Sequence, residues 1–116
     1  MKPAVDSFLP LAPATLHILL ALAGENLHGY GIMQEVARQS DGRYKLGPGT
    51  LYDNLQRLMK QNLVEEVAGQ EGESSRRRYY RLSTLGRGVL SAEIARLEGV
   101  VKQARLHLKM PQPRRA

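Results

Sequence analysis

A stretch of hydrogen-bonding side chains occupies one predicted helix in the middle of the chain. Leu51, Leu55 and Leu58 follow one another at the spacing of a buried helical stripe. The opposite face is then formed by Thr50, Asp53, Asn54, Arg57, Lys60 and Gln61. Such side chains form hydrogen bonds with base edges and phosphates. The pattern therefore indicates a helix suited to a groove of duplex DNA.

A basic, strand-like segment follows this helix. Residues 76–78 are three arginines, and Tyr79 and Tyr80 come next. Residues 76–87 contain five arginines and no acidic residue. A local basic patch is the electrostatic footprint of nucleic-acid binding. An arginine run by itself is usually a solvated surface, but beside a polar helix it is placed to hold the adjacent phosphate backbone.

Each side chain on the predicted helix has a chemical role. Asparagine can bond adenine in two places and arginine can bond guanine in the same way, so Asn54 and Arg57 are candidates for base edges. Thr50 is a third candidate, and Lys60 is better placed for the backbone. The expected recognition-helix contacts are Thr50, Tyr52, Asp53, Asn54, Arg57 and Lys60.

The basic segment is expected to form the wing. Its predicted DNA contacts are Arg76, Arg77, Arg78 and Tyr79. The arginines would lie along phosphates or in the minor groove, where arginine favours narrow A·T-rich segments. Alternation along the strand predicts that Tyr80 belongs to the core and that Tyr79 is half exposed.

Composition limits the other possibilities. The chain has 116 residues, enough for one domain, with 17 basic and 11 acidic residues and a formal charge of +6. A positive balance favours a polyanionic partner. The chain has no cysteine and its three histidines lack metal-ligand spacing. No nucleophile with a base and no cofactor loop is found, so we expect no enzyme, no metal, no cofactor and a cytoplasmic location.

The order of elements predicts the fold class. Residues 1–12 resemble an irregular arm, and an apolar helix follows from Pro13 to Gly24. That run is too short for a membrane span, and prolines argue against a signal peptide. Two further helices and a hairpin complete residues 13–82. The expected fold is mainly α with a small β-hairpin, a winged helix-turn-helix DNA-binding domain.

A long helix is expected over residues 83–110. Its apolar positions are spaced 4, 3, 4, 3 and 4 residues apart, namely Leu90, Ile94, Leu97, Val101, Ala104 and Leu108. This heptad seam is typical of a coiled coil. A helix of about 25 residues is about 37 Å long and overshoots so small a domain. The seam therefore predicts a second subunit, and residues 111–116 are expected to form a flexible tail.

Three motifs in order resemble the PadR family of bacterial transcriptional regulators, in its short branch with a single C-terminal helix. They are His28-Gly29-Tyr30-Gly31-Ile32, Gly49-Thr50-Leu51-Tyr52-Asp53-Asn54-Leu55-Gln56-Arg57-Leu58 and Arg78-Tyr79-Tyr80-Arg81-Leu82-Ser83-Thr84-Leu85-Gly86. The resemblance implies a homodimeric repressor that binds an inverted-repeat operator and responds to a small-molecule effector or to another signal. It implies a dimer through the first and last helices, which adds Leu16, Leu19 and Leu20 to the seam residues.

Two departures from that family are visible. The family often has proline after the Leu-Tyr pair, whereas this chain has Asp53, which either accepts from a cytosine amino group or turns away. Relatives that stack flat ligands between subunits use aromatic side chains, and this chain has none after Tyr80. A stacking effector on the last helix is therefore disfavoured.

Two alternatives to operator recognition stay open, an RNA-binding module and a winged-helix adaptor for another protein. Recognition of single-stranded RNA prefers exposed aromatic side chains on a sheet, and this hairpin offers only two tyrosines. An adaptor has no need of a basic wing.

Overall fold

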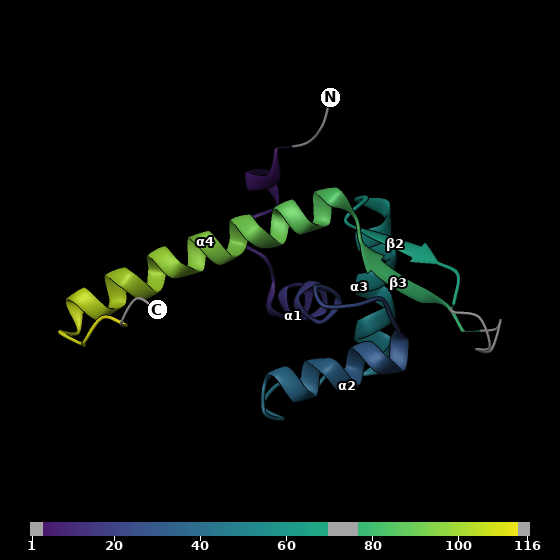
Figure 1. Cartoon of the computed structure of the whole chain (residues 1–116), viewed down its shortest axis with the longest axis horizontal. Helices are drawn as coiled ribbons and strands as arrows, with labels where there is room; N and C mark the ends of the chain where they lie inside the picture. The colour runs from purple at the N-terminus through teal and green to yellow at the C-terminus, as the bar shows by residue number, and fades with distance from the viewer. Residues whose placement is uncertain (1–3, 70–76, 114–116) are drawn as a thin grey trace.

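The computed structural model describes residues 4–69 and 77–113. In chain order its elements are η1 (Val5–Phe8), α1 (Pro13–Leu22), β1 (Leu27–His28), α2 (Gly29–Gln39), α3 (Pro48–Lys60), β2 (Val64–Val67), β3 (Tyr79–Leu82) and α4 (Thr84–His107). Figure 1 shows α1 at the centre, with α2, α3 and the strands around it, while α4 crosses the domain and extends beyond it. The predicted fold class is confirmed.

The sheet has one more strand than expected. Its order is β1-β3-β2, and both pairings are antiparallel. The register sets Val64 against Leu82 in the hairpin, and Leu27 against Tyr80 on the other edge. The sequence predicted only the two strands of the hairpin. The two-residue strand forms because β3, far away in the sequence, supplies its hydrogen-bond partners.

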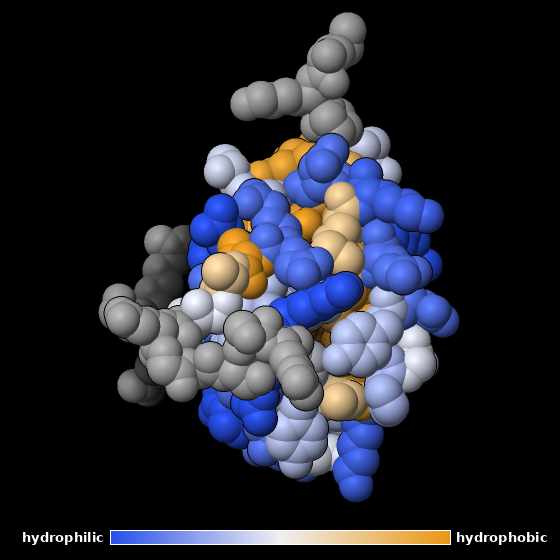
Figure 2. All heavy atoms as spheres, turned by 90° about the vertical axis from the view of Figure 1, so that its right-hand side faces the viewer, coloured by the Kyte–Doolittle hydropathy of each residue, from blue (hydrophilic) through white to orange (hydrophobic). Residues whose placement is uncertain are grey.

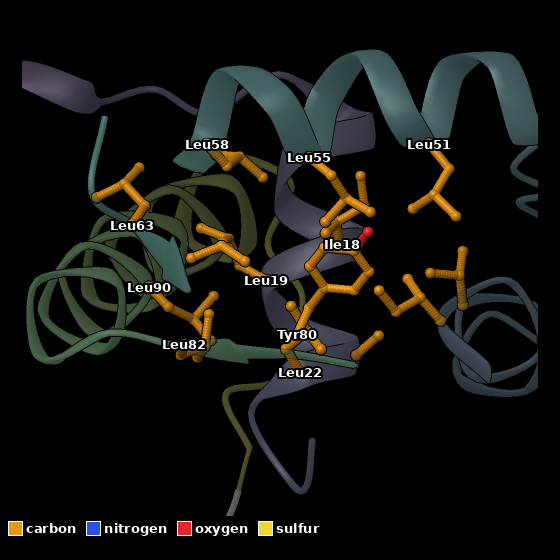
Figure 3. Close-up of a cluster of buried hydrophobic side chains, with 14 of the residues drawn as sticks. Ile18, Leu19, Leu22, Leu51, Leu55, Leu58, Leu63, Tyr80, Leu82 and Leu90 are labelled. Carbon is orange, nitrogen blue, oxygen red and sulfur yellow. The ribbon is translucent and has the colours of Figure 1, made fainter. Parts of the chain in front are cut away.

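The core forms between α1, α3 and the sheet (Figure 3). The predicted seam of Leu51, Leu55 and Leu58 is fully buried. Helix α1 is buried on several of its sides. Leu19 of α1 is 0% exposed in the single chain, so its predicted place in a dimer interface is wrong. Tyr80 is buried, as predicted. Among the helices that the structure describes, none is long and apolar enough to cross a membrane.

The ends of α3 are defined by its sequence. Gly47 precedes Pro48, whose missing N–H costs nothing in the first turn. At the other end Asn62 adopts a left-handed φ of 61°, and the Leu63 N–H donates to the Leu58 carbonyl at 2.9 Å. This closure is the Schellman type, which satisfies the last carbonyls. It turns the chain from the helix directly into β2.

The N-terminal segment packs against the domain, contrary to the expected irregular arm. Residues of η1 contact α4. Further along, the Leu11 N–H donates to Oε2 of Glu93 at 2.8 Å. Periodicity could not predict this, because the partner carboxylate lies 82 positions away in the sequence.

Glu93 is the buried acid that holds this segment. Its side chain is 1% exposed, and Arg96 Nε donates to Oε1 at 2.5 Å. The pKa of Glu93 is lowered, mainly by the hydrogen bond from Arg96 and secondarily by that from the Leu11 N–H, while burial opposes the shift. A carboxylate whose pKa is lowered by folding stabilises the protein above its unfolded pKa of about 4.3, and that contribution disappears as the pH falls through the folded value.

We therefore expect Glu93→Gln to lower the free energy of unfolding at neutral pH by about 1–2 kcal/mol, since it weakens two charge-assisted hydrogen bonds. The difference from the wild type should shrink when the pH is lowered below about 4. Urea unfolding at neutral pH and at a pH below about 4 measures this difference in the free energy of unfolding. Glu98→Gln is the matched control, because Glu98 is an exposed acid on the same helix. An equal loss at both pH values would contradict the role given to the ionised carboxylate.

Candidate nucleic-acid interface

One face of α3 is open to solvent because the leucine seam buries the other. The exposed side chains along it are Thr50, Tyr52, Asp53, Gln56, Arg57 and Lys60. Asp53, Gln56 and Lys60 follow at intervals of three and four residues and so lie one above another in the middle of this face. Sequence reasoning missed Gln56, although its position one turn from both Asp53 and Lys60 is the signal that identifies it.

Asn54 does not belong to this face. It is 7% exposed, and its Oδ1 accepts hydrogen bonds from Thr15 Oγ1 at 3.0 Å and Arg57 Nη2 at 2.6 Å. Its Nδ2 donates to the Thr50 carbonyl at 2.8 Å. The prediction that Asn54 contacts a base is therefore wrong. Its amide instead links α3 to α1 and holds the guanidinium of Arg57 against the helix.

Tyr52 stands at the edge of the exposed face nearest α2. A Cβ atom added to Gly29 would lie only 2.3 Å from Tyr52 Oη. Glycine at position 29 therefore leaves the room that the tyrosine ring occupies. The tyrosine is half exposed, and its hydroxyl lies against Gly29.

The base of the wing carries exposed arginines next to α3. Arg77 and Arg78 are both exposed, while Arg76 lies outside the described residues. Arg78 lies 3.6 Å from a carboxylate oxygen of Glu66, and Arg81 bonds Glu65 at 2.9 Å. Solvent-exposed pairs of this kind contribute little to stability. The arginines are thus available to an anionic partner.

Tyr79 was expected to be half exposed and to contact DNA, and that prediction is wrong. Its side chain is 8% exposed. The ring meets the imidazole of His28 edge-on, with centroids 5.3 Å apart, and Gly69 packs against its other side. Strand alternation failed here because β1 pairs along the second edge of β3 and places the His28 side chain beside the Tyr79 ring, which a two-stranded hairpin would have left open.

A hollow of about 480 Å³ separates α3 from the base of the wing. Its polar lining comes from the start of α2, from α3 and from the wing, namely His28, Tyr30, Tyr52, Gln56, Arg77 and Arg78. Tyr80 also lines it, and burial, with a smaller effect of Glu66, raises the pKa of its hydroxyl, which stays neutral. Figure 2, which looks toward this end of the molecule, shows a largely hydrophilic surface.

The predicted seam on α4 divides into two parts. Leu90 is buried with Val89 in the core of its own chain, so its predicted place in a dimer interface is wrong. Beyond it Ile94, Val101 and Leu108 are 37%, 48% and 69% exposed. Leu97 is partly exposed and Ala104 exposed, and on α1 Leu16 and Leu20 are partly exposed. The outer half of α4 thus carries an apolar stripe that the described part of the chain leaves uncovered.

The arrangement is that of a winged helix-turn-helix protein. A central helix is covered by α2 and α3, the exposed face of α3 lies beside a basic hairpin, and a long helix follows. Such a domain places one helix in the major groove and the wing on adjacent phosphates.

Comparison with known proteins agrees with this class. Residues 18–92 match the Transcriptional regulator PadR-like family. A transcriptional regulator from Mycobacterium tuberculosis is 36% identical over 93 residues, which cover 79% of this chain and 82% of that protein. This chain therefore belongs to the PadR-like family of transcriptional regulators, whose members are regulators rather than enzymes.

Solved structures show the same fold. A PadR family transcription regulator from Clostridium difficile R20291 is 27% identical with a TM-score of 0.67, over 84% of this chain and 99% of that one. Bacillus subtilis PadR, solved in complex with operator DNA, superposes with a TM-score of 0.63 at 19% identity, over 73% of this chain and 48% of that one. At that identity the second likeness shows the fold alone.

Proposed function

We propose that this protein is a homodimeric repressor that binds an inverted-repeat operator in double-stranded DNA. The observation that carries the proposal is the exposed polar face of α3 beside two exposed arginines of the wing. Arg57, Gln56, Asp53 and Thr50 would meet base edges, and Lys60 would hold the backbone. Bacillus subtilis PadR, which shares this fold, was solved in complex with operator DNA, and this supports operator DNA as the partner.

The second copy would cover the outer half of α4. Ile94, Leu97, Val101, Ala104 and Leu108 share one side of this helix at heptad spacing, and Leu16 and Leu20 of α1 would complete the interface. Two helices with the same seam bury it by pairing with each other. A two-fold pairing also sets the two α3 helices at a defined separation, which an inverted repeat requires.

A small-molecule effector would act through this pairing. It would release DNA only by binding more tightly to an arrangement in which the α3 helices have another spacing. The side chains of α4 beside the shallow cavity at Ile94, Leu97 and Val101 are aliphatic or polar, so an effector held there would rest on aliphatic rather than aromatic walls.

Selection of bound sequences from random duplex DNA tests the proposal. We expect a two-fold symmetric site with half-site centres about 10 base pairs apart. Arg57→Ala should relax the base preference at one position of the site and cost about 1–3 kcal/mol of binding free energy. Lys60→Ala should weaken binding to all DNA sequences by a similar factor. An RNA duplex of equal length is the control. No enrichment at low salt, an asymmetric site, or equal binding to RNA would overturn the proposal.

A further inference from the structure

Several hydrogen-bond donors line the hollow between α3 and the wing. His28 contributes from the start of α2, Tyr52 from α3, and Arg77 and Arg78 from the wing. The described residues that line the hollow include no carboxylate. Glu66 pairs with Arg78 at 3.6 Å from outside this lining. A lining of several donors and cations is suited to an anion.

The hydrogen bonds of the two ring nitrogens of His28 show that an acceptor is needed beside Arg77. Nδ1 accepts the N–H of Gly31 at 3.0 Å and so caps α2. That nitrogen must carry a lone pair, so the proton of the neutral ring sits on Nε2. Nε2 lies 3.2 Å from Arg77 Nη1. Both groups are then donors, and neither can accept from the other. An acceptor bound beside them would satisfy both at once.

Tyr52 places a third donor near this point. Its hydroxyl lies against the backbone of Gly29, the residue next to His28, and only glycine at this position leaves space for it. The three groups therefore come from three separate elements, α3, the start of α2 and the wing. His28 is held by its cap to Gly31. Tyr52 is held by its packing against Gly29.

We propose that this hollow seats one backbone phosphate of bound DNA, which accepts hydrogen bonds from His28 Nε2, Arg77 and Tyr52. The inference rests on the proposed function, since it names a partner group for the same interface. A phosphate oxygen only accepts, which fits a site of donors, and phosphates lie along the duplex backbone that the wing meets. The seat lies between the recognition helix and the wing and fixes the angle at which both meet the duplex.

The test replaces single phosphates of an operator half-site by neutral methylphosphonates and measures binding to the full-length protein. We expect one position at which the wild type loses about tenfold in affinity. Arg77→Gln should lose a similar factor in affinity on unmodified DNA. The slope of log K against log salt concentration should become shallower by about 0.9. The methylphosphonate at the sensitive position should cause this variant no further loss of affinity. His28→Asn should behave in the same way without the change in slope, because asparagine still caps α2 but does not reach the hollow.

Lys109→Gln is the control, because it removes the same charge at the far end of α4. Losses at every methylphosphonate that are equal in the wild type and both variants would overturn the seat but leave the proposed function intact. Failure of the wild type to bind duplex DNA would overturn the proposed function and the seat together. Stabilisation by inorganic phosphate that requires Arg77, with DNA affinity unchanged in the variants, would show a small-anion site and overturn the seat.

Discussion

Replacing Val101 by aspartate should convert the protein from a dimer to a monomer and reduce operator affinity by at least about a hundredfold. Val101 is in the middle of the uncovered stripe on α4 and is 48% exposed in the single chain. In a two-fold pairing, the two aspartates would face each other in a desolvated seam, which costs several kcal/mol for each charge. Loss of the pairing also removes the simultaneous contact with both half-sites.

Sedimentation equilibrium and binding to a two-half-site duplex measure these effects. The fold of each chain should survive, because Val101 contacts solvent rather than the core, and circular dichroism checks this. Gln103→Asp is the matched control, since it adds the same charge on the opposite side of the helix. A Val101→Asp protein that remains dimeric would show that the seam is not the interface. Truncating α4 from Val89 onward is a poorer test, because Val89 and Leu90 belong to the domain core.

Gly86→Ala should destabilise the fold by about 3 kcal/mol or more. A Cβ atom at this position would lie 2.1 Å from the backbone carbonyl oxygen of Leu63, and backbone cannot move aside as a flexible side chain can. The clash can be relieved only if the first turn of α4 moves away from the start of β2. That would also weaken the hydrogen bond from the Gly86 N–H to Ser83 Oγ at 2.9 Å, which caps the helix.

Urea unfolding of Gly86→Ala and Gly88→Ala provides the comparison. In the same helix, a Cβ at Gly88 would meet Val5 Cγ1 at an ordinary 3.4 Å. Gly88→Ala should therefore be neutral or stabilise by about 0.5–1 kcal/mol through helix propensity. For 116 residues, with an entropy of unfolding of about 2.1 cal/mol/K per residue, about 3 kcal/mol corresponds to a fall in Tm of about 12 °C. Similar midpoints for the two variants would contradict the close approach at Gly86.

Ser83, just before α4, links the recognition helix α3 to the proposed dimerisation helix α4. Ser83 Oγ donates to the Asn62 carbonyl at 2.6 Å, and the Ser83 N–H donates to the Leu63 carbonyl at 3.0 Å. These bonds tie the end of α3 to the start of α4. A change in the angle between paired α4 helices would therefore move the two α3 helices with them, which is the coupling that a ligand-responsive repressor needs.

Local rules were sufficient for much of this protein. Leu51, Leu55 and Leu58 had to share one side of α3, because a helix repeats every 3.6 residues, and glycine followed by proline had to begin that helix. Asn62 is one of the few residues that tolerate the left-handed conformation at its end. The heptad spacing from Leu90 to Leu108 likewise predicted a helix longer than the domain, which the structure confirms as Thr84–His107.

The burial of residues at the edge of a helical or strand pattern depended on tertiary structure. Periodicity put Asn54 with the polar face, but Thr15 of α1 draws its amide inward. Tyr79 is covered by a strand that exists only because β3 pairs with it, and Glu93 is buried because the N-terminal segment returns to bond it. The hollow between α3 and the wing also joins His28, Tyr52 and Arg77 from separate elements. A helical or strand period reports which side of its own element a residue occupies, while burial and pairing depend on what other elements bring to that side.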